Sequence, residues 1–164
     1  MHILIFYSKL QTLFQSIKYV VNLTEIIARM TSKILYQGGL RTVCTHIQSG
    51  STIETDAPTD NRGKGERFSP TDLVATALGT CIVTTMGIKA NDHNINIDGT
   101  ECEVEKIMAS NPRRIAEVKV NIKFPKDQIY SASDKQLMEH TAIHCPVAKS
   151  LHPDLKQTLT FLWP

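Results

Sequence analysis

The chain has 164 residues, of which 41% are apolar and 21% charged, and its formal net charge is +2. This length is sufficient for one domain with a buried core. The small net charge, the dispersed basic residues and the 6% aromatic content argue against a nucleic-acid-binding protein. The four cysteines have no regular spacing, which argues against a secreted disulfide scaffold and favours a reducing, cytoplasmic location.

Residues 1–29 form an N-terminal extension that precedes the domain predicted for residues 30–164. Charged and polar residues interrupt its apolar stretch, so we predict neither a signal peptide nor a membrane span. Its apolar spacing is compatible with an amphipathic helix that packs on the domain or on a partner. Alternatively, the segment lies upstream of a start at Met30, which is favoured because Met30 directly precedes the first strand.

Three short strands are predicted at the start of the domain. They cover residues 31–37, 41–48 and 52–55, with turns at Gly38-Gly39 and Ser49-Gly50-Ser51. Residues 56–67 are rich in Pro, Asp, Asn and Gly and predict an exposed loop. Its glycines, Gly63 and Gly65, would let the backbone lie near a pocket, but the full phosphate-binding-loop pattern is missing.

A long helix follows the loop. Ser69 is predicted as its N-cap, Pro70 as the first helical residue and Asp72 as the partner of Ser69 in a capping box. No charged residue occurs from Leu73 to Ile88, which is typical of a helix in the middle of a fold. We consider it too short, and too rich in Thr and Gly, for a membrane span. Its small residues predict a closely packed neighbouring helix, and the helix is expected to face its twin in a dimer.

The second half alternates between strands and helices. Strands are predicted over residues 95–110, 115–124 and 157–162, and helices over 127–141 and 146–151. In the first of these helices, Ile129, Leu137 and Met138 are expected to point inward. The order of elements predicts an α+β fold.

The cysteines lie in different settings. Cys44 and Cys102 fall on predicted strands and are interpreted as small buried hydrophobic residues. Cys81 lies about three turns into the long helix, beyond the reach of its dipole, so a Cys81 thiolate requires a positive side chain from Arg41 or Arg67. Cys145 precedes Pro146 and is the expected N-cap of a helix, where local physics favours a thiolate. Two such thiols indicate a redox couple, in which one attacks a peroxide and the other traps the oxidised product.

Other catalytic arrangements are less well supported. His140 and His144 are four residues apart, but no zinc-protease Glu or Cys-x-x-Cys pattern accompanies them. Pro146 also predicts a helix break near His144 that would separate the two rings, so we predict no metal site. A serine hydrolase is not supported, because no Gly-x-Ser-x-Gly elbow occurs.

From about Thr31 onward the chain resembles the OsmC/Ohr family of organic hydroperoxide detoxification proteins, and its OsmC-like branch in particular. The resemblance lies in Gly38-Gly39-Leu40-Arg41, in residues 63–73, in Gly79-Thr80-Cys81 and in His144-Cys145-Pro146-Val147. It implies antiparallel sheets around a central helix, in an intertwined homodimer. It further implies a thiol peroxidase in which Cys81 attacks an organic hydroperoxide, Cys145 forms the disulfide and Arg41 assists. No cofactor is bound; a dihydrolipoyl dithiol restores the thiols.

One departure from the family affects the site. Ohr-type proteins carry Asn-Pro-Glu where this chain has Ser69-Pro70-Thr71, so the Glu that holds the helper Arg is absent. Asp72 or Glu66 is expected to replace it, and Glu66 is counted among the catalytic residues. If Cys145 is the more acidic thiol, the two cysteine roles are reversed.

Two further expectations concern substrate and class. Leu78, Ile82 and Met86 flank Cys81 by one turn on either side and favour a hydrophobic hydroperoxide over hydrogen peroxide. The alternative class is a non-catalytic, dimeric redox-sensing or small-molecule-binding protein on the same fold. Retention of both thiols favours the enzyme, whereas the missing Glu favours the alternative.

Overall fold

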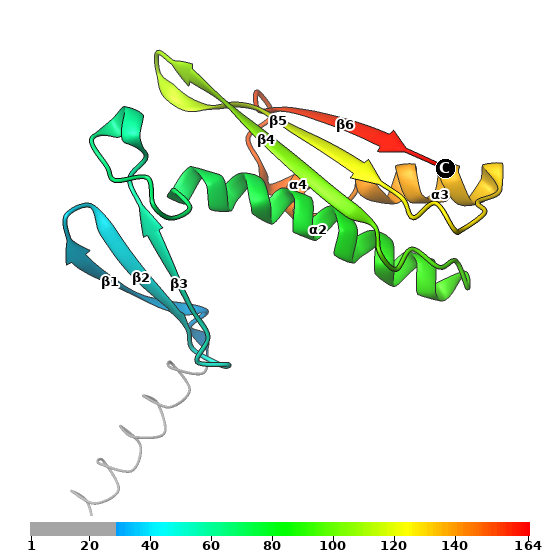
Figure 1. Cartoon of the computed structure of the whole chain (residues 1–164), viewed down its shortest axis with the longest axis horizontal. Coiled ribbons are helices and arrows are strands. Elements are labelled where there is room, and N and C mark those ends of the chain that lie inside the picture. The colour runs from blue at the N-terminus through cyan, green and yellow to red at the C-terminus, as the bar shows by residue number, and fades with distance from the viewer. Residues whose placement is uncertain (1–28) are drawn as a thin grey trace, which may run out of the picture. The chain divides into compact units, whose positions relative to one another are not determined.

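The computed structural model describes residues 29–164 (Figure 1), so the interpretations of residues 1–28 lie outside the described residues. The chain divides between Phe68 and Ser69 into two compact units. The division falls where the loop ends and the long helix is about to begin.

The first unit is a three-stranded antiparallel sheet in the order β1-β2-β3. The strands are β1 (Ser32–Gly38), β2 (Arg41–His46) and β3 (Thr52–Asp56), which confirms the three predicted strands. Gly38 and Gly39 have φ of 86° and 58°, a region that glycine enters without strain, and this allows the tight turn between β1 and β2.

The loop after β3 contains a single 3-10 turn, η1 (Thr59–Asn61). A Cβ added at Gly63 would collide with the Ala57 carbonyl, so only glycine fits there. The Gly63 N–H donates to the Pro58 carbonyl at 3.0 Å, and the Gly65 N–H donates to the Ala57 carbonyl at 3.2 Å. These backbone contacts give the predicted loop a defined path back along β3.

The second unit begins with α2 (Pro70–Asp92). Its capping box is as predicted: Ser69 Oγ accepts from the Asp72 N–H at 3.1 Å, and the Ser69 N–H donates to Asp72 Oδ2 at 2.7 Å. With 23 residues, α2 meets the length and composition of a membrane span, so the prediction that it is too short was wrong. Its contacts with the rest of this unit are those of a core helix.

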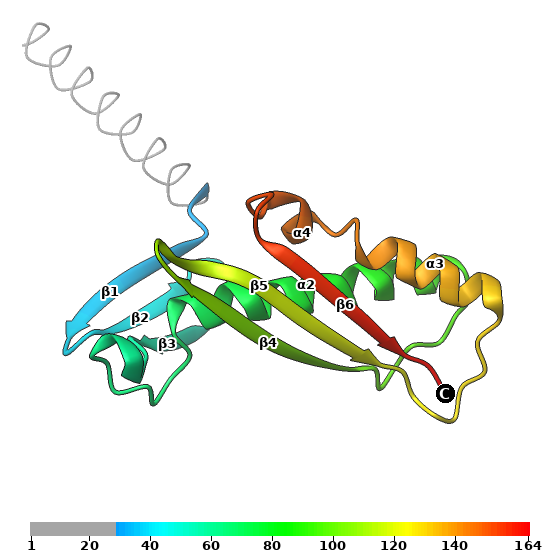
Figure 2. The same cartoon turned by 90° about the horizontal axis from the view of Figure 1, so that it is seen from above.

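The second unit also contains a three-stranded sheet with two shorter helices (Figure 2). The elements are β4 (Glu101–Ser110), β5 (Arg113–Lys123), α3 (Ala132–Ala142), α4 (Pro146–Ser150) and β6 (Lys156–Leu162). The α+β class is confirmed. One pairing departs from the antiparallel expectation: β6 runs parallel to β5, because α3 and α4 carry the chain back across the unit between these strands.

Two predicted boundaries were wrong. Residues 95–100 form a turn before β4 instead of its first part. Helix α3 begins at Ala132 rather than Asp127, because Ser131 and Asp134 form the capping box that sets its start. Ile129 therefore precedes the helix and is fully exposed, contrary to the inward position expected for it.

The apolar core lies in the second unit. Leu78, Ile82 and Met86 of α2 are fully buried with Val118, Val120 and Ile122 of β5 and Met138 of α3. On another side of α2, a Cβ added at Gly79 would lie 2.7 Å from Val104 Cγ2 and 3.2 Å from Cys102 Sγ. At position 79 the small residue thus admits strand β4 at close range, while the helices packed against α2 are α3 and α4.

Candidate functional site

Cys81 and Cys145 come together within the second unit. Cys81 lies in the middle of α2, where it is partly buried and packs against the core. Cys145 is the N-cap of α4 and is fully buried. The helices that carry them, α2 and α4, pack against each other, and Cys81 contributes to the raised pKa of Cys145, so the two side chains are neighbours although 63 residues separate them in the sequence. This brings together the two thiols that the sequence singled out.

The environment of Cys145 favours its neutral form. Its pKa is raised above the ordinary thiol value, mainly by burial and further by the neighbouring Cys81 side chain. The N–H groups of Ala148 and Val147 act in the opposite direction, and the Ala148 N–H donates to Cys145 Sγ at 3.4 Å. Burial therefore outweighs the helix terminus. The expectation that the cap position makes Cys145 an acidic thiol was wrong, because the pKa of Cys145 is raised and not lowered.

Arg41 lies in the first unit, in a cluster with two carboxylates. Arg41 and Asp56 face each other across β2 and β3. Arg41 Nε donates to Asp56 Oδ1 at 2.6 Å and Arg41 Nη2 donates to Asp56 Oδ2 at 2.7 Å, a bidentate pair. Arg41 Nη2 also donates to Glu66 Oε2 at 2.8 Å. The hydrogen bonds to Asp56 and Glu66 hold the pKa of Arg41 well above its usual range, and Arg41 lowers the pKa of Asp56.

The sequence predicted Arg41 and Glu66 but missed Asp56. Asp56 was read as the first residue of an exposed loop, yet its side chain is only 2% exposed. A usable signal was present in the predicted turn at residues 49–51. Counting outward from Thr45 opposite Thr52 places Arg41 opposite Asp56, as the strand register has it.

Asp72, the other expected substitute for the family Glu, has different partners. Its Oδ1 is 2.7 Å from Lys106 Nζ, and its Oδ2 accepts from the Ser69 N–H. Burial acts to raise the pKa of Asp72, but the hydrogen bonds and charge of Lys106 and Ser69 lower it overall. Lys106 Nζ also donates to Thr71 Oγ1 at 2.8 Å. By the family resemblance, Thr71 occupies the position of the Ohr-type Glu. Lys106 therefore contacts both the side chain at this position and Asp72.

Four further residues named from the sequence have other roles in the structure. Arg67, considered as the cation for Cys81, pairs with Glu54, with Arg67 Nε 2.8 Å from Glu54 Oε2. The apolar residues that flank Cys81 in α2, Leu78, Ile82 and Met86, are completely buried. They form the core and offer no accessible surface to a substrate, so the substrate preference inferred from them is not supported.

His140 and His144 remain adjacent despite the helix break. Their ring centroids are 4.3 Å apart, and His144 Nδ1 is 2.7 Å from the His140 carbonyl oxygen. The prediction that the break separates the rings was therefore wrong. Within residues 29–164, no group of three or more His, Cys, Asp or Glu side chains is placed to hold a metal ion.

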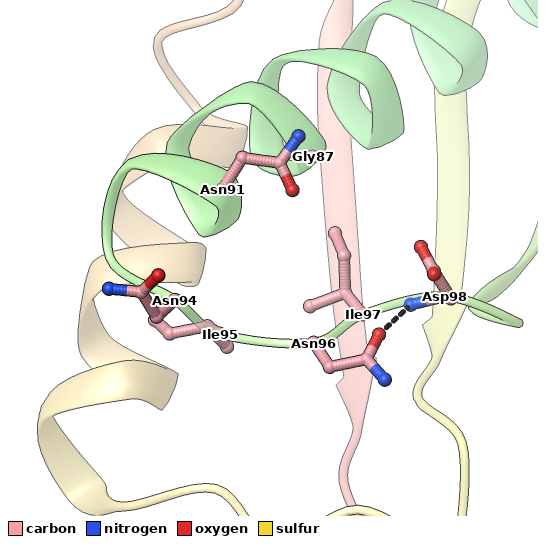
Figure 3. A pocket seen from close by; sticks show the side chains of 7 residues that line it. All are labelled: Gly87, Asn91, Asn94, Ile95, Asn96, Ile97 and Asp98. Atoms are coloured by element: carbon pink, nitrogen blue, oxygen red, sulfur yellow. Dashed lines mark hydrogen bonds between the residues drawn. The ribbon is translucent and has the colours of Figure 1, made fainter.

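Two clefts lie elsewhere on the second unit. One, of about 390 Å³, lies at the C-terminal end of α2 and is lined by Gly87, Asn91, Asn94, Ile95, Asn96, Ile97 and Asp98 (Figure 3). The side chains of Asn94, Asn96 and Asp98 point in different directions, and Asn96 Oδ1 accepts from the Asp98 N–H at 2.9 Å. A second cleft, of about 290 Å³, lies between α2 and β4 and is lined in part by Cys102. Neither contains Cys81 or Cys145.

The fold and the paired thiols can now be compared with known proteins. The OsmC-like protein family matches residues 63–160. A crystal structure from Psychrobacter arcticus 273-4, named as an osmotic stress induced and detoxification response protein, is 52% identical. Its TM-score is 0.77, and the match covers 80% of this chain and 95% of the Psychrobacter chain. No curated protein sequence shows significant similarity.

More distant structures share the fold. An organic hydroperoxide resistance protein OsmC from Legionella pneumophila is 16% identical with a TM-score of 0.64, over 82% of this chain and 98% of its own. The organic hydroperoxide resistance protein OhrB of Bacillus subtilis is 20% identical with a TM-score of 0.56, over 80% of this chain and 98% of its own. Two small sheets with a central helix thus define an α+β protein of the OsmC/Ohr fold. The chain belongs to the OsmC-like protein family.

Proposed function

We propose that this protein is a cysteine-based peroxidase that reduces organic hydroperoxides. The observation that carries the proposal is that Cys81 and Cys145 are neighbours at the core of the second unit, where α2 packs on α4. A disulfide requires Cα atoms within about 7 Å of each other in at least one conformation, and neighbouring thiols on packed helices favour such an approach. The family and the names of its hydroperoxide resistance members support the same chemistry.

The first step is oxidation of Cys81. The Cys81 thiolate attacks the terminal peroxide oxygen, the O–O bond breaks, and the departing alkoxide takes a proton to become an alcohol. Cys81 becomes a sulfenic acid. Sulfur is oxidised by two electrons and the peroxide is reduced by two.

The second step uses the neutral Cys145 thiol. Cys145 sulfur attacks the Cys81 sulfenic acid, the S–O bond breaks, and the hydroxyl leaves as water with the Cys145 proton. The product is a Cys81–Cys145 disulfide. A dihydrolipoyl dithiol then reduces it, giving back both thiols and forming the cyclic lipoyl disulfide. A reducing cytoplasm would supply this reductant.

Arg41 is proposed as the electrophilic assistant of the first step. Its guanidinium remains charged at every physiological pH and presents donors in a fixed plane. Such a cation favours the thiolate over the thiol, and it can hydrogen-bond the oxygen on which negative charge develops. The assignment to Cys81 chemistry comes from the family resemblance.

A homodimer is the proposed working form. In the single chain the first sheet leaves Ile34, Leu35, Tyr36 and Ile53 more than half exposed. Ile34, Tyr36 and Ile53 share one face of the sheet, because Ile34 and Ile53 both lie opposite Cys44 and side chains alternate along a strand. Exposed apolar side chains gathered on one face are typical of an interface. A second copy of the chain is the partner that the family resemblance implies.

A coupled peroxidase assay tests the function. Wild type would be assayed with cumene hydroperoxide and dihydrolipoamide beside Cys81→Ser and Cys145→Ser, with Cys44→Ser as a control outside the pair. We expect turnover to fall about 1,000-fold or more in Cys81→Ser. Cys145→Ser should accumulate the Cys81 sulfenic acid, and Cys44→Ser should behave as wild type. Absence of turnover in wild type would leave the redox-sensing or binding alternative.

A further inference from the structure

The two carboxylates that hold Arg41 differ in their surroundings. The Asp56 side chain is 2% exposed and accepts three hydrogen bonds, two from Arg41 and one from the Glu66 N–H at 3.2 Å. The Glu66 side chain is 57% exposed and makes a single contact with Arg41. A buried, fully bonded carboxylate is hard to displace, whereas an exposed single ion pair exchanges readily with water and other anions.

The geometry of the guanidinium determines which donors remain. Asp56 occupies the edge formed by Arg41 Nε and Nη2 and so fixes the plane of the group. The second Nη2 donor goes to Glu66. The two Nη1 donors have no hydrogen-bond partner among residues 29–164. The end of the guanidinium, between Nη1 and Nη2, is therefore the edge available to a ligand, and Glu66 covers half of it.

We propose that Asp56 is the positioning residue that orients Arg41, and that Glu66 is a displaceable carboxylate which competes with the hydroperoxide oxygen for Arg41 Nη2. The proposal rests on the peroxidase function proposed above. The backbone supports the division of roles, because the Glu66 N–H is anchored on Asp56 while its carboxylate is free to turn into solvent.

The two roles predict opposite kinetic effects. Loss of the Asp56 charge frees the guanidinium from its plane, and misplacement of a catalytic group by about 1 Å can lower the rate about 100-fold. Loss of the Glu66 charge removes a competitor for Arg41, which affects binding and leaves the chemical step unchanged. Because exposed ion pairs are weak, the change in KM should be at most about fivefold.

The experiment compares Asp56→Asn, Glu66→Gln and the control Glu54→Gln in the full chain with cumene hydroperoxide. Glu54 of β3 is a matched control because it pairs with Arg67, in the same unit, at the same 2.8 Å separation as Glu66 and Arg41. We expect kcat/KM to fall about 100-fold in Asp56→Asn. We expect KM to fall up to about fivefold in Glu66→Gln with kcat unchanged, and no change in Glu54→Gln.

A structural readout separates this proposal from the peroxidase function. The Nε–H signal of Arg41 in a ¹⁵N–¹H spectrum should exchange slowly in wild type and in Glu66→Gln, and should be lost in Asp56→Asn. This result does not require turnover, so an inactive wild type would refute the function alone. A retained Nε–H signal in Asp56→Asn, or a higher KM in Glu66→Gln, would overturn the proposal. If Asp56→Asn fails to fold, the KM of Glu66→Gln still tests the proposal, because Glu66 is exposed and its substitution should not disturb the fold.

Discussion

The two units of the chain are stabilised in different ways. In residues 69–164 a continuous apolar core joins α2, α3 and the β4-β5-β6 sheet, and the thiols lie within it. In residues 29–68 the apolar side chains of β1 and β3 are exposed, and the buried side chains are the polar Thr55 and Asp56. The first unit thus positions the charged cluster around Arg41, whereas the second unit positions the Cys81 and Cys145 thiols.

This difference indicates how the proposed chemistry is divided. Burial raises the pKa of Cys145, which lies in the apolar core against which Cys81 packs. A charged network keeps Arg41 ionised and in a defined plane. The four predictions below test the contrast between the units, from the largest expected effect to the smallest.

The largest effect is expected in the core of the second unit. Ile82 is fully buried whereas Ile129, in the same unit, is fully exposed. We expect Ile82→Ala to lower the free energy of unfolding by about 2–5 kcal/mol, because it removes buried surface and leaves a cavity. Ile129→Ala should change it by less than about 0.5 kcal/mol. Urea denaturation measures both, and similar losses would contradict the burial described for α2.

The two glycines of α2 give a matched pair. A Cβ at Gly79 would press on Val104 and Cys102, whereas a Cβ at Gly87 meets no atom within 4 Å. We expect Gly79→Ala to destabilise the protein by about 1–3 kcal/mol through overpacking. Gly87→Ala should stabilise it by about 0.5–1 kcal/mol through helix propensity. Thermal unfolding of the two variants should move in opposite directions, and a shared direction would refute the close approach of β4 at Gly79.

The first unit is expected to depend on a second copy of the chain. Ile34 is 64% exposed on β1, so Ile34→Lys should leave the fold of each chain intact. It should weaken a homodimer at least about tenfold, since a buried unpaired charge at an interface is strongly unfavourable. Sedimentation velocity over a range of concentrations measures the association. An unchanged dimer would show that β1 lies outside the interface.

Acid should weaken the first unit through Asp56. Because Arg41 lowers the folded-state pKa of Asp56, its stabilisation is present above the ordinary carboxyl pKa and is lost as pH falls through the lowered value. Wild type should therefore lose more stability than Asp56→Asn below about pH 4. Asp72, Glu117 and Asp134 also have lowered pKa values, and they are common to both proteins. Denaturation midpoints at neutral and acid pH measure the difference, and parallel losses would contradict it.

Features set by neighbouring residues were predictable from the sequence. The Ser69 capping box and the β1–β2 turn follow from local chemistry, and both are found. The start of α3 could have been predicted by the same rule, since Ser131 and Asp134 repeat the spacing of Ser69 and Asp72. The predicted start at Asp127 instead included the apolar residue Ile129 in the helix.

Features that depend on distant residues were not predictable in this way. Lys106 binds Asp72 and Thr71 across more than 30 residues, and no local pattern indicates it. Asp56 required the strand register as well as the strands. The pKa of Cys145 depends on burial, which outweighs the helix terminus that the sequence displays.

One measurement tests the central claim most directly. The fully reduced protein would be treated with one equivalent of cumene hydroperoxide per chain, and its thiols and peptides analysed by mass spectrometry after rapid acid quenching. The proposed mechanism predicts the loss of two thiols per chain and a single new disulfide, between Cys81 and Cys145, with Cys44 and Cys102 still reduced. Oxidation that leaves Cys81 a thiol, or that yields no Cys81–Cys145 disulfide, would contradict it.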